Sequence, residues 1–71
     1  MDNTLYTAFI GKAVKVKICD GSEFRGTSAA IDAYLNISLE SVFYLQKGQE
    51  PRYYSSLFIK GSYIDHIALD V

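Results

Sequence analysis

The stretch KAVKVKIC, residues 12–19, places valine and isoleucine at alternate positions between lysines and other residues. Alternation with a period of two is the pattern of a half-buried β-strand. The dipeptide Asp20-Gly21 follows directly, and a glycine there supplies the positive φ that a tight hairpin turn needs. The sequence therefore predicts a strand over residues 12–19 that turns back into a second strand.

The second strand, residues 23–31, carries one glycine in its interior, Gly26. A lone glycine inside a strand usually marks a sharp bend, a bulge or a close backbone approach. A strand that bends at Gly26 can curl the sheet towards a barrel. This position therefore predicts strong curvature rather than a flat hairpin.

Three further stretches have strand patterns, with polar turns that contain glycine or proline between them: residues 35–45, 53–59 and 63–69. Residues 1–10 can form at most a short helix, which Gly11 would end. Five short strands at regular spacing are typical of a small antiparallel barrel. We therefore expect a mainly β protein, with a short N-terminal helix followed by a five-stranded, strongly bent antiparallel barrel.

The composition indicates one small domain over residues 1–71, with a net charge of −1. A chain of this length buries only about 60% of the surface that its unfolded form exposes, so its own core is marginal. One cysteine and one histidine, Cys19 and His66, cannot build a disulfide framework or a four-ligand metal site. We expect no metal or cofactor, and association with other chains as the stabilising route.

The chain has neither a signal-peptide pattern at its start nor the roughly 18 apolar residues of a membrane span. We therefore expect a soluble, intracellular protein without a membrane partner. A protein that coats nucleic acid normally carries a clear basic excess, which this chain lacks. Binding of nucleic acid would need a few focused contacts, or positive charge concentrated by the assembly of several chains.

Residues 31–39, Ile-Asp-Ala-Tyr-Leu-Asn-Ile-Ser-Leu, set Asp32, Tyr34 and Asn36 at alternate positions. An aromatic with an amide is the pairing that stacks a base and reads its edge. Each residue also has a plainer interpretation. Tyr34 alone is more often a packing or surface aromatic, Asn36 suits a turn with left-handed φ, and Asp32 suits a carboxylate that accepts hydrogen bonds from loop N–H groups.

Two other features leave alternatives open. Lys15 and Lys17 on the first strand could follow an RNA backbone, although a solvated strand face is the commoner arrangement. The pair Tyr53-Tyr54 could stack bases, although tyrosine is also enriched at protein interfaces.

Two groups of residues resemble the two sequence motifs of the Sm and Sm-like family. The first is Gly11-Lys12, Val14-Lys15-Val16, Asp20-Gly21, Phe24-Arg25-Gly26, Asp32, Tyr34, Asn36 and Leu39; the second is Ile59-Lys60-Gly61-Ser62-Tyr63-Ile64 with Ile67. Together the motifs span nearly the whole chain. The sequence Asp-Ala-Tyr-Leu-Asn at residues 32–36 is similar to the F-type members, Sm protein F and its Sm-like paralogue, and Gly61 favours the paralogue.

The resemblance implies an Sm fold whose fourth strand pairs with the fifth strand of a neighbour, closing a ring of six or seven Sm-like subunits. It also implies that single-stranded, uridine-rich RNA binds at the inner rim. A base would stack between Tyr34 and Lys60, and Asn36 would hydrogen-bond the base edge. Asp32 would orient the RNA-binding loop, and Gly61 would let the backbone approach the base.

The chain departs from the family pattern at two positions, with Lys60 in place of the usual arginine and Ser62 in place of the usual asparagine. An ammonium stacks less well than a planar guanidinium, so Tyr34 would carry more of the stacking. The resemblance implies an RNA-binding subunit in the nucleus and/or cytoplasm, acting on U6 snRNA and pre-mRNA splicing or in mRNA decay. The alternative is a structural subunit, such as an Sm F-type core component, that completes a ring with little RNA contact. We expect no enzyme, because one histidine and one cysteine provide no catalytic set.

Overall fold

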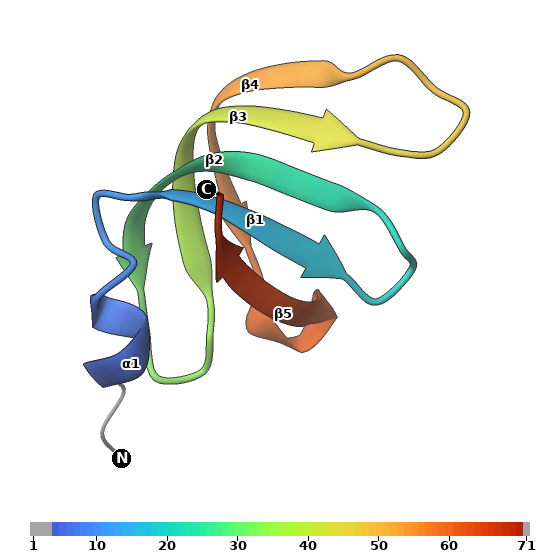
Figure 1. Ribbon diagram of the computed structural model, residues 1–71. Coiled ribbons are helices and arrows are strands. Elements are labelled where there is room, and N and C mark those ends of the chain that lie inside the picture. The colour runs from blue at the N-terminus through green and yellow to red at the C-terminus, as the bar shows by residue number, and fades with distance from the viewer. Residues whose placement is uncertain (1–3, 71) are drawn as a thin grey trace.

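The computed structural model describes residues 4–70 and shows one strongly bent, five-stranded antiparallel sheet (Figure 1). The strands are β1 Ala13–Ile18, β2 Glu23–Ile31, β3 Ile37–Leu45, β4 Arg52–Ile59 and β5 Ile64–Leu69. The order across the sheet is β4-β3-β2-β1-β5. The mainly β architecture and the five strands predicted from the sequence are thus confirmed, and the strand ends agree within two residues.

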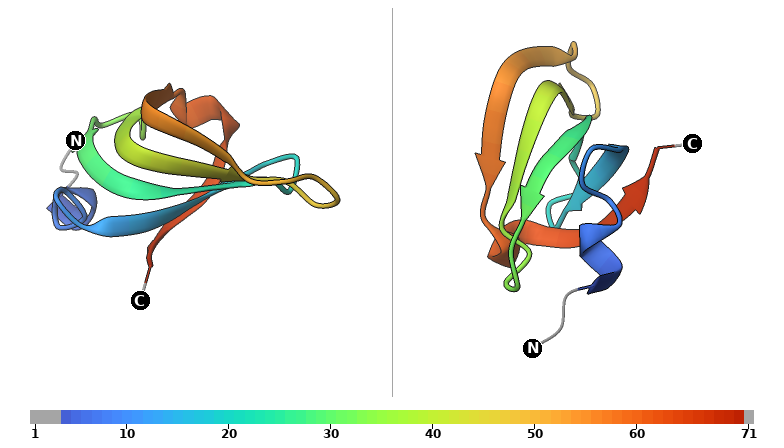
Figure 2. Two further views of the ribbon diagram at one scale, coloured as in Figure 1. Left: turned by 90° about the horizontal axis from the view of Figure 1, so that it is seen from above. Right: turned by 90° about the vertical axis from the view of Figure 1, so that its left-hand side faces the viewer.

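The sheet bends sharply along β2 and β3 (Figure 2). The register between these strands is irregular at Gly26. The register between the two strands shifts between Arg25 and Thr27, and Ser41 takes a φ of 53° there. A Cβ on Gly26 would lie 3.0 Å from the carbonyl oxygen of Glu40 and 3.3 Å from Val42. The irregularity and close approach expected at Gly26 are confirmed. The extra residue of the bulge lies on β3, opposite Gly26, and the glycine permits the close approach of β3.

The core lies on the concave side of this bend. Its buried residues alternate along the strands and come from four of them: Val14, Val16, Ile31, Ile37, Leu39, Val42 and Ile59. Burying one valine or isoleucine side chain contributes roughly 1.5–3 kcal/mol relative to leaving it exposed. Three valines, three isoleucines and one leucine among the described residues make a small core, as the length of the chain implies.

The sheet order leaves one edge of β4 and one edge of β5 unpaired within residues 4–70. The two strands are joined by the short 3₁₀ turn η1, Gly61–Tyr63, but no ladder connects them. The expected barrel is therefore an open, bent sheet in the single chain. Unpaired edges are templates for strands of other chains.

Residues 1–10 were predicted to form at most a short helix. The structure has one helical turn, α1 Thr4–Thr7, and residues 1–3 lie outside the described part of the chain. The rings of Tyr6 and Phe9 meet edge to face at 6.1 Å and pack against the core. The helix ends at Thr7, and not at Gly11 as predicted, because the chain turns over residues 8–11. Gly11 has a φ of 80° and donates a hydrogen bond to the Ser28 carbonyl at 2.7 Å.

Within residues 4–70, no helix is long and apolar enough to cross a membrane. The same residues contain no group of three or more histidine, cysteine or acidic side chains that could hold a metal ion.

Candidate nucleic-acid interface

The loop between β2 and β3, residues 32–36, is closed by the side chain of Asp32. Its Oδ1 accepts hydrogen bonds from the backbone N–H of Tyr34 at 2.8 Å and of Asn36 at 3.0 Å. The Leu35 N–H also donates to the Asp32 carbonyl at 3.1 Å. Because the chain closes into a turn here, β3 begins at Ile37 and not at residue 35, where the pattern had predicted its start.

The second carboxylate oxygen of Asp32 orients the amide of Asn36. Asn36 Nδ2 donates to Asp32 Oδ2 at 2.9 Å. This hydrogen bond, together with those from the backbone of Tyr34 and Asn36, lowers the pKa of Asp32 below its usual value because all of them favour the ionised carboxylate. Asp32 therefore holds the loop backbone and the Asn36 amide in place.

The other end of the Asn36 amide reaches the second motif. Asn36 Oδ1 accepts a hydrogen bond from the backbone N–H of Gly61 at 2.7 Å, across 25 positions of sequence. The amide therefore links Asp32 on one loop to Gly61 on the other. An asparagine amide has two N–H groups and two acceptor lone pairs, so one of each remains to meet a base.

The residue with left-handed φ in this loop is Leu35, at 66°, and not Asn36. The sequence suggested Asn36 for that conformation, so that interpretation was wrong. A bulky residue at positive φ is an outlier that costs about 1–3 kcal/mol. Leu35 is half-buried and packs against the core, and this burial offsets the cost.

Gly61 brings the second loop against the first. A Cβ there would overlap the carbonyl oxygen of Tyr34 and lie 2.9 Å from the carbonyl carbon of Leu35. The sequence predicted that Gly61 would allow a close approach to a base. The structure adds an approach to protein backbone, which no residue with a side chain could make without moving the loop.

The two side chains expected to hold a base stand on these adjoining loops. Tyr34 is 82% exposed, so its ring has little part in the packing of the chain. Lys60 is exposed and directly precedes Gly61, with extended backbone at φ −73° and ψ 132°. An exposed aromatic, a lysine and an oriented amide can stack a base, attract a phosphate and donate a hydrogen bond to a base edge.

The remaining polar candidates do not join this site. His66 Nδ1 lies 2.9 Å from Asp65 Oδ2, and both side chains are exposed on β5. Cys19 is an exposed free thiol. Sequence reasoning missed the hydrogen bond between Asn36 and Gly61 and the strained Leu35, because neither leaves a signal in a single sequence.

The bent open sheet and the two coupled loops define a small β protein with a candidate site for single nucleobases. A model of the LSM domain matches residues 4–69, and the chain belongs to this family. The chain is accordingly not an enzyme.

Named relatives are similar over most of the chain. The U6 snRNA-associated Sm-like protein LSm6 of Pyricularia oryzae is 36% identical over 59 residues, covering 83% of this chain and 71% of the relative. The LSM complex subunit lsm6 of Schizosaccharomyces pombe is 29% identical over 69 residues, covering 96% and 92%.

Solved structures agree in fold. The Pyrococcus abyssii Sm protein in complex with a uridine heptamer superposes with a TM-score of 0.87 at 26% identity, covering 97% of both chains. A heptameric archaeal Sm protein superposes with a TM-score of 0.85 at 25% identity, covering 94% of this chain and 97% of the other.

Proposed function

We propose that this chain is an RNA-binding subunit of a six- or seven-membered Sm-like ring that holds single-stranded, uridine-rich RNA in RNA processing. We take residues 1–71 as one Sm-like domain. The observation that carries the proposal is the coupling of Asn36 to Gly61, because it fixes an amide in the same loop that carries the exposed Tyr34.

Within this proposal, Tyr34 stacks on a base, Lys60 adds positive charge on the other side, and Asn36 donates its remaining N–H to the base edge. Asp32 holds the loop, and Gly61 holds the two loops together. Uracil suits this site because its carbonyl oxygens accept a hydrogen bond from an amide N–H. Recognition of single strands by stacking and base-edge contacts is the usual mode for unpaired RNA.

The unpaired edges of β4 and β5 support assembly. If β4 of one chain pairs with β5 of the next, every chain satisfies both edges and the array closes into a ring. A small core gains most from such pairing. The heptameric archaeal relative has the same fold.

One base stacked on one aromatic contributes roughly 1–3 kcal/mol. This corresponds to weak binding for a single subunit, since 1 mM affinity already needs about 4 kcal/mol. A ring presents several sites to one strand. Tight binding is therefore a property of the assembly and not of one chain.

We further infer that the chain is an F-type member, of the Sm-like rather than the Sm branch. The relatives named LSm6 support this subfamily, and their description as U6 snRNA-associated supports a role in splicing, with mRNA decay as the other process for such a ring. The location would then be the nucleus, the cytoplasm or both.

The test is the affinity of the ring, assembled with whatever partner subunits it needs, for heptauridine. Tyr34→Ala should weaken binding by about tenfold, because roughly 1.4 kcal/mol of stacking is lost. Gln49→Ala removes an exposed side chain from the β3–β4 turn and should leave heptauridine binding unchanged. Equal affinities for the wild type and Tyr34→Ala, in rings of equal mass, would exclude the proposed site.

A second candidate is a structural subunit that completes the ring with little RNA contact. Two observations favour it: half of the Asn36 amide is used within the chain, and the base would meet Lys60 and not an arginine. If this candidate is right, a preparation that lacks this chain should not form a ring of full mass. Tyr34→Ala should then leave the affinity of the ring for heptauridine unchanged.

A further inference from the structure

Four side chains form a line across the face of the sheet that points away from the core. The strand register pairs Lys15 of β1 with Arg25 of β2, Arg25 with Phe43 of β3, and Phe43 with Tyr53 of β4. Cross-strand partners point to the same face of a sheet. We call these four residues the outer row; at about 4.8 Å per strand it spans roughly 14 Å.

The aromatic half of the outer row is exposed. The rings of Phe43 and Tyr53 lie 5.3 Å apart between centroids, tilted by 59°. Phe43 is 48% exposed and Tyr53 58%, although burial of either ring would be favourable. Because the two exposed rings are tilted against each other, they form a platform in which a base stacks on one ring and meets the edge of the other.

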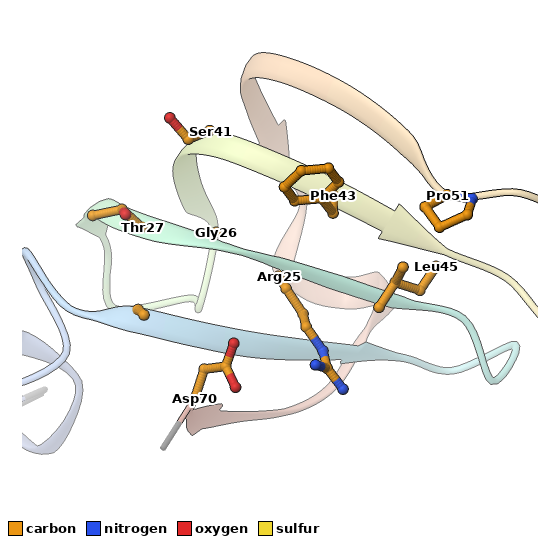
Figure 3. A pocket seen from close by; sticks show the side chains of 9 residues that line it. Arg25, Gly26, Thr27, Ser41, Phe43, Leu45, Pro51 and Asp70 are labelled. Carbon is orange, nitrogen blue, oxygen red and sulfur yellow. The ribbon is translucent and has the colours of Figure 1, made fainter.

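A hollow of about 470 Å³ lies beside this platform, where the sheet bends (Figure 3). Its lining includes Arg25, Gly26, Thr27, Ser41 and Phe43, with Leu45 and Pro51 at its far end. A volume in this range accommodates a small ligand such as one nucleoside. The hollow therefore offers room for a base against the face of Phe43.

The other half of the outer row is positively charged. Glu23 Oε2 accepts from Arg25 Nε at 2.5 Å, which leaves the terminal guanidinium nitrogens for another anion. Glu23 also lies 3.9 Å from Lys17 Nζ, whereas Lys15 has no ion pair with residues 4–70. Asp70 lines the hollow on the β1 side and adds one negative charge there. Lys15, Lys17 and Arg25 carry three positive charges here, against two negative charges on Glu23 and Asp70. A phosphate at this end of the outer row therefore meets a net charge of +1.

The outer row is separate from the loops that carry Tyr34 and Lys60, because it lies on the faces of β1 to β4. Pairing of β4 and β5 with neighbouring chains would extend the sheet edge to edge and leave its faces uncovered. The outer row would therefore stay accessible in a ring.

We propose that the outer row is a second binding site for single-stranded RNA, with a base stacked on Phe43 and Tyr53 and its phosphates held by Lys15 and Arg25. This goes beyond the loop site. Cations beside exposed aromatics fit a nucleic-acid strand better than a peptide, because each nucleotide carries both an anion and a π-face. A strand longer than the loop sites can hold would reach this face.

The test compares heptauridine with a 21-nucleotide oligouridine on the full chain in its ring. Tyr53→Ala should weaken binding of the longer RNA by about tenfold and leave heptauridine unchanged, since one stacked base is lost. Tyr53→Phe should retain wild-type affinity. Arg25→Gln should reduce the slope of log affinity against log salt by about 0.7, the value for one phosphate contact of a single strand.

Arg52→Gln is the matched control, because it removes the same charge from β4 next to Tyr53 in sequence but outside the outer row. Unchanged affinity for the longer RNA in Tyr53→Ala and Arg25→Gln overturns the proposal and leaves this face to a protein partner. Equal weakening of both RNAs also overturns it. Tyr34→Ala reports on the loop site separately, since it should weaken heptauridine, so failure of one site is distinguishable from failure of the other.

Discussion

Asn36 Oδ1 accepts a hydrogen bond from the backbone N–H of Gly61 at 2.7 Å, and this contact joins the β2–β3 loop to the turn between β4 and β5. The same side chain donates to Asp32 at 2.9 Å. The amide thus has a structural role before any RNA is bound. Loss of the amide should therefore affect the stability of the folded chain separately from any effect on binding.

Asn36→Ala should lower the free energy of unfolding by about 1–3 kcal/mol, because it leaves the part-buried N–H of Gly61 without its partner. Urea denaturation measures the change. Gln49→Ala, which removes an exposed amide from the β3–β4 turn, is the control and should change stability by less than about 0.5 kcal/mol. Equal stability of Asn36→Ala and wild type would show that the hydrogen bond between Asn36 and Gly61 does not stabilise the fold.

The loop around Asp32 should depend on pH only in strong acid. Its hydrogen bonds with Asn36 and Tyr34 lower the pKa of Asp32 in the folded state. The contribution of the carboxylate is therefore fully present above the ordinary aspartate value of about 3.9 and is lost as the pH falls through the lower folded-state pKa. NMR signals of the Asn36 side-chain amide should titrate below pH 3.9.

Asp32→Asn serves as the control for this titration, since its Asn36 signals should not respond to pH over the same range. A midpoint at or above the ordinary aspartate pKa would contradict the assigned hydrogen bonds.

Gly61→Ala should destabilise the chain more than Gly48→Ala does. At Gly61 a methyl group overlaps the carbonyl oxygen of Tyr34, whereas at Gly48, with a φ of 80°, it meets nothing within 4 Å. The overlap should cost about 3 kcal/mol, and the positive φ alone about 1 kcal/mol. Thermal or urea unfolding gives both values, and a reversed order would show that the loops can separate at little cost.

At position 35, alanine and glycine substitutions should not follow their usual order of stability. Alanine normally exceeds glycine in stability by about 0.5–1 kcal/mol, but Leu35 has a φ of 66°, which glycine adopts freely. Both variants lose the packing of the leucine side chain beyond Cβ against the core. Leu35→Gly should therefore be at least as stable as Leu35→Ala in urea, and a clear advantage of alanine would refute the role assigned to this backbone conformation.

The sequence predicted the strands well because their signals are local. Alternating residues in β1, the Asp20-Gly21 turn and Gly26 each specify one feature by themselves. The open edges of the sheet, by contrast, depend on how far the bend at Gly26 carries β4 round towards β5. The alternation of apolar residues carries no information about the distance between β4 and β5. The pattern therefore suggested a barrel, whereas the single chain forms an open sheet.

The candidate site was predicted as a set of residues but not as a geometry. Tyr34, Asn36 and Lys60 came from the motifs, and the structure places them on two loops in backbone contact. The assignment of left-handed φ to Asn36 was wrong because residue preference favours asparagine, whereas Asp32 closes the turn so that Leu35 takes that position. The local hydrogen bonds of Asp32, together with the packing of Leu35 against the core, fix this conformation.

Photocrosslinking of the assembled ring to heptamers of 4-thiouridine tests the central claim most directly, with the adducts assigned to single residues by mass spectrometry. The account predicts an adduct on Tyr34, and its disappearance in Tyr34→Ala while the mass of the ring is unchanged. A ring that binds the heptamer with no adduct on residues 32–36 or 60–61 would contradict the account.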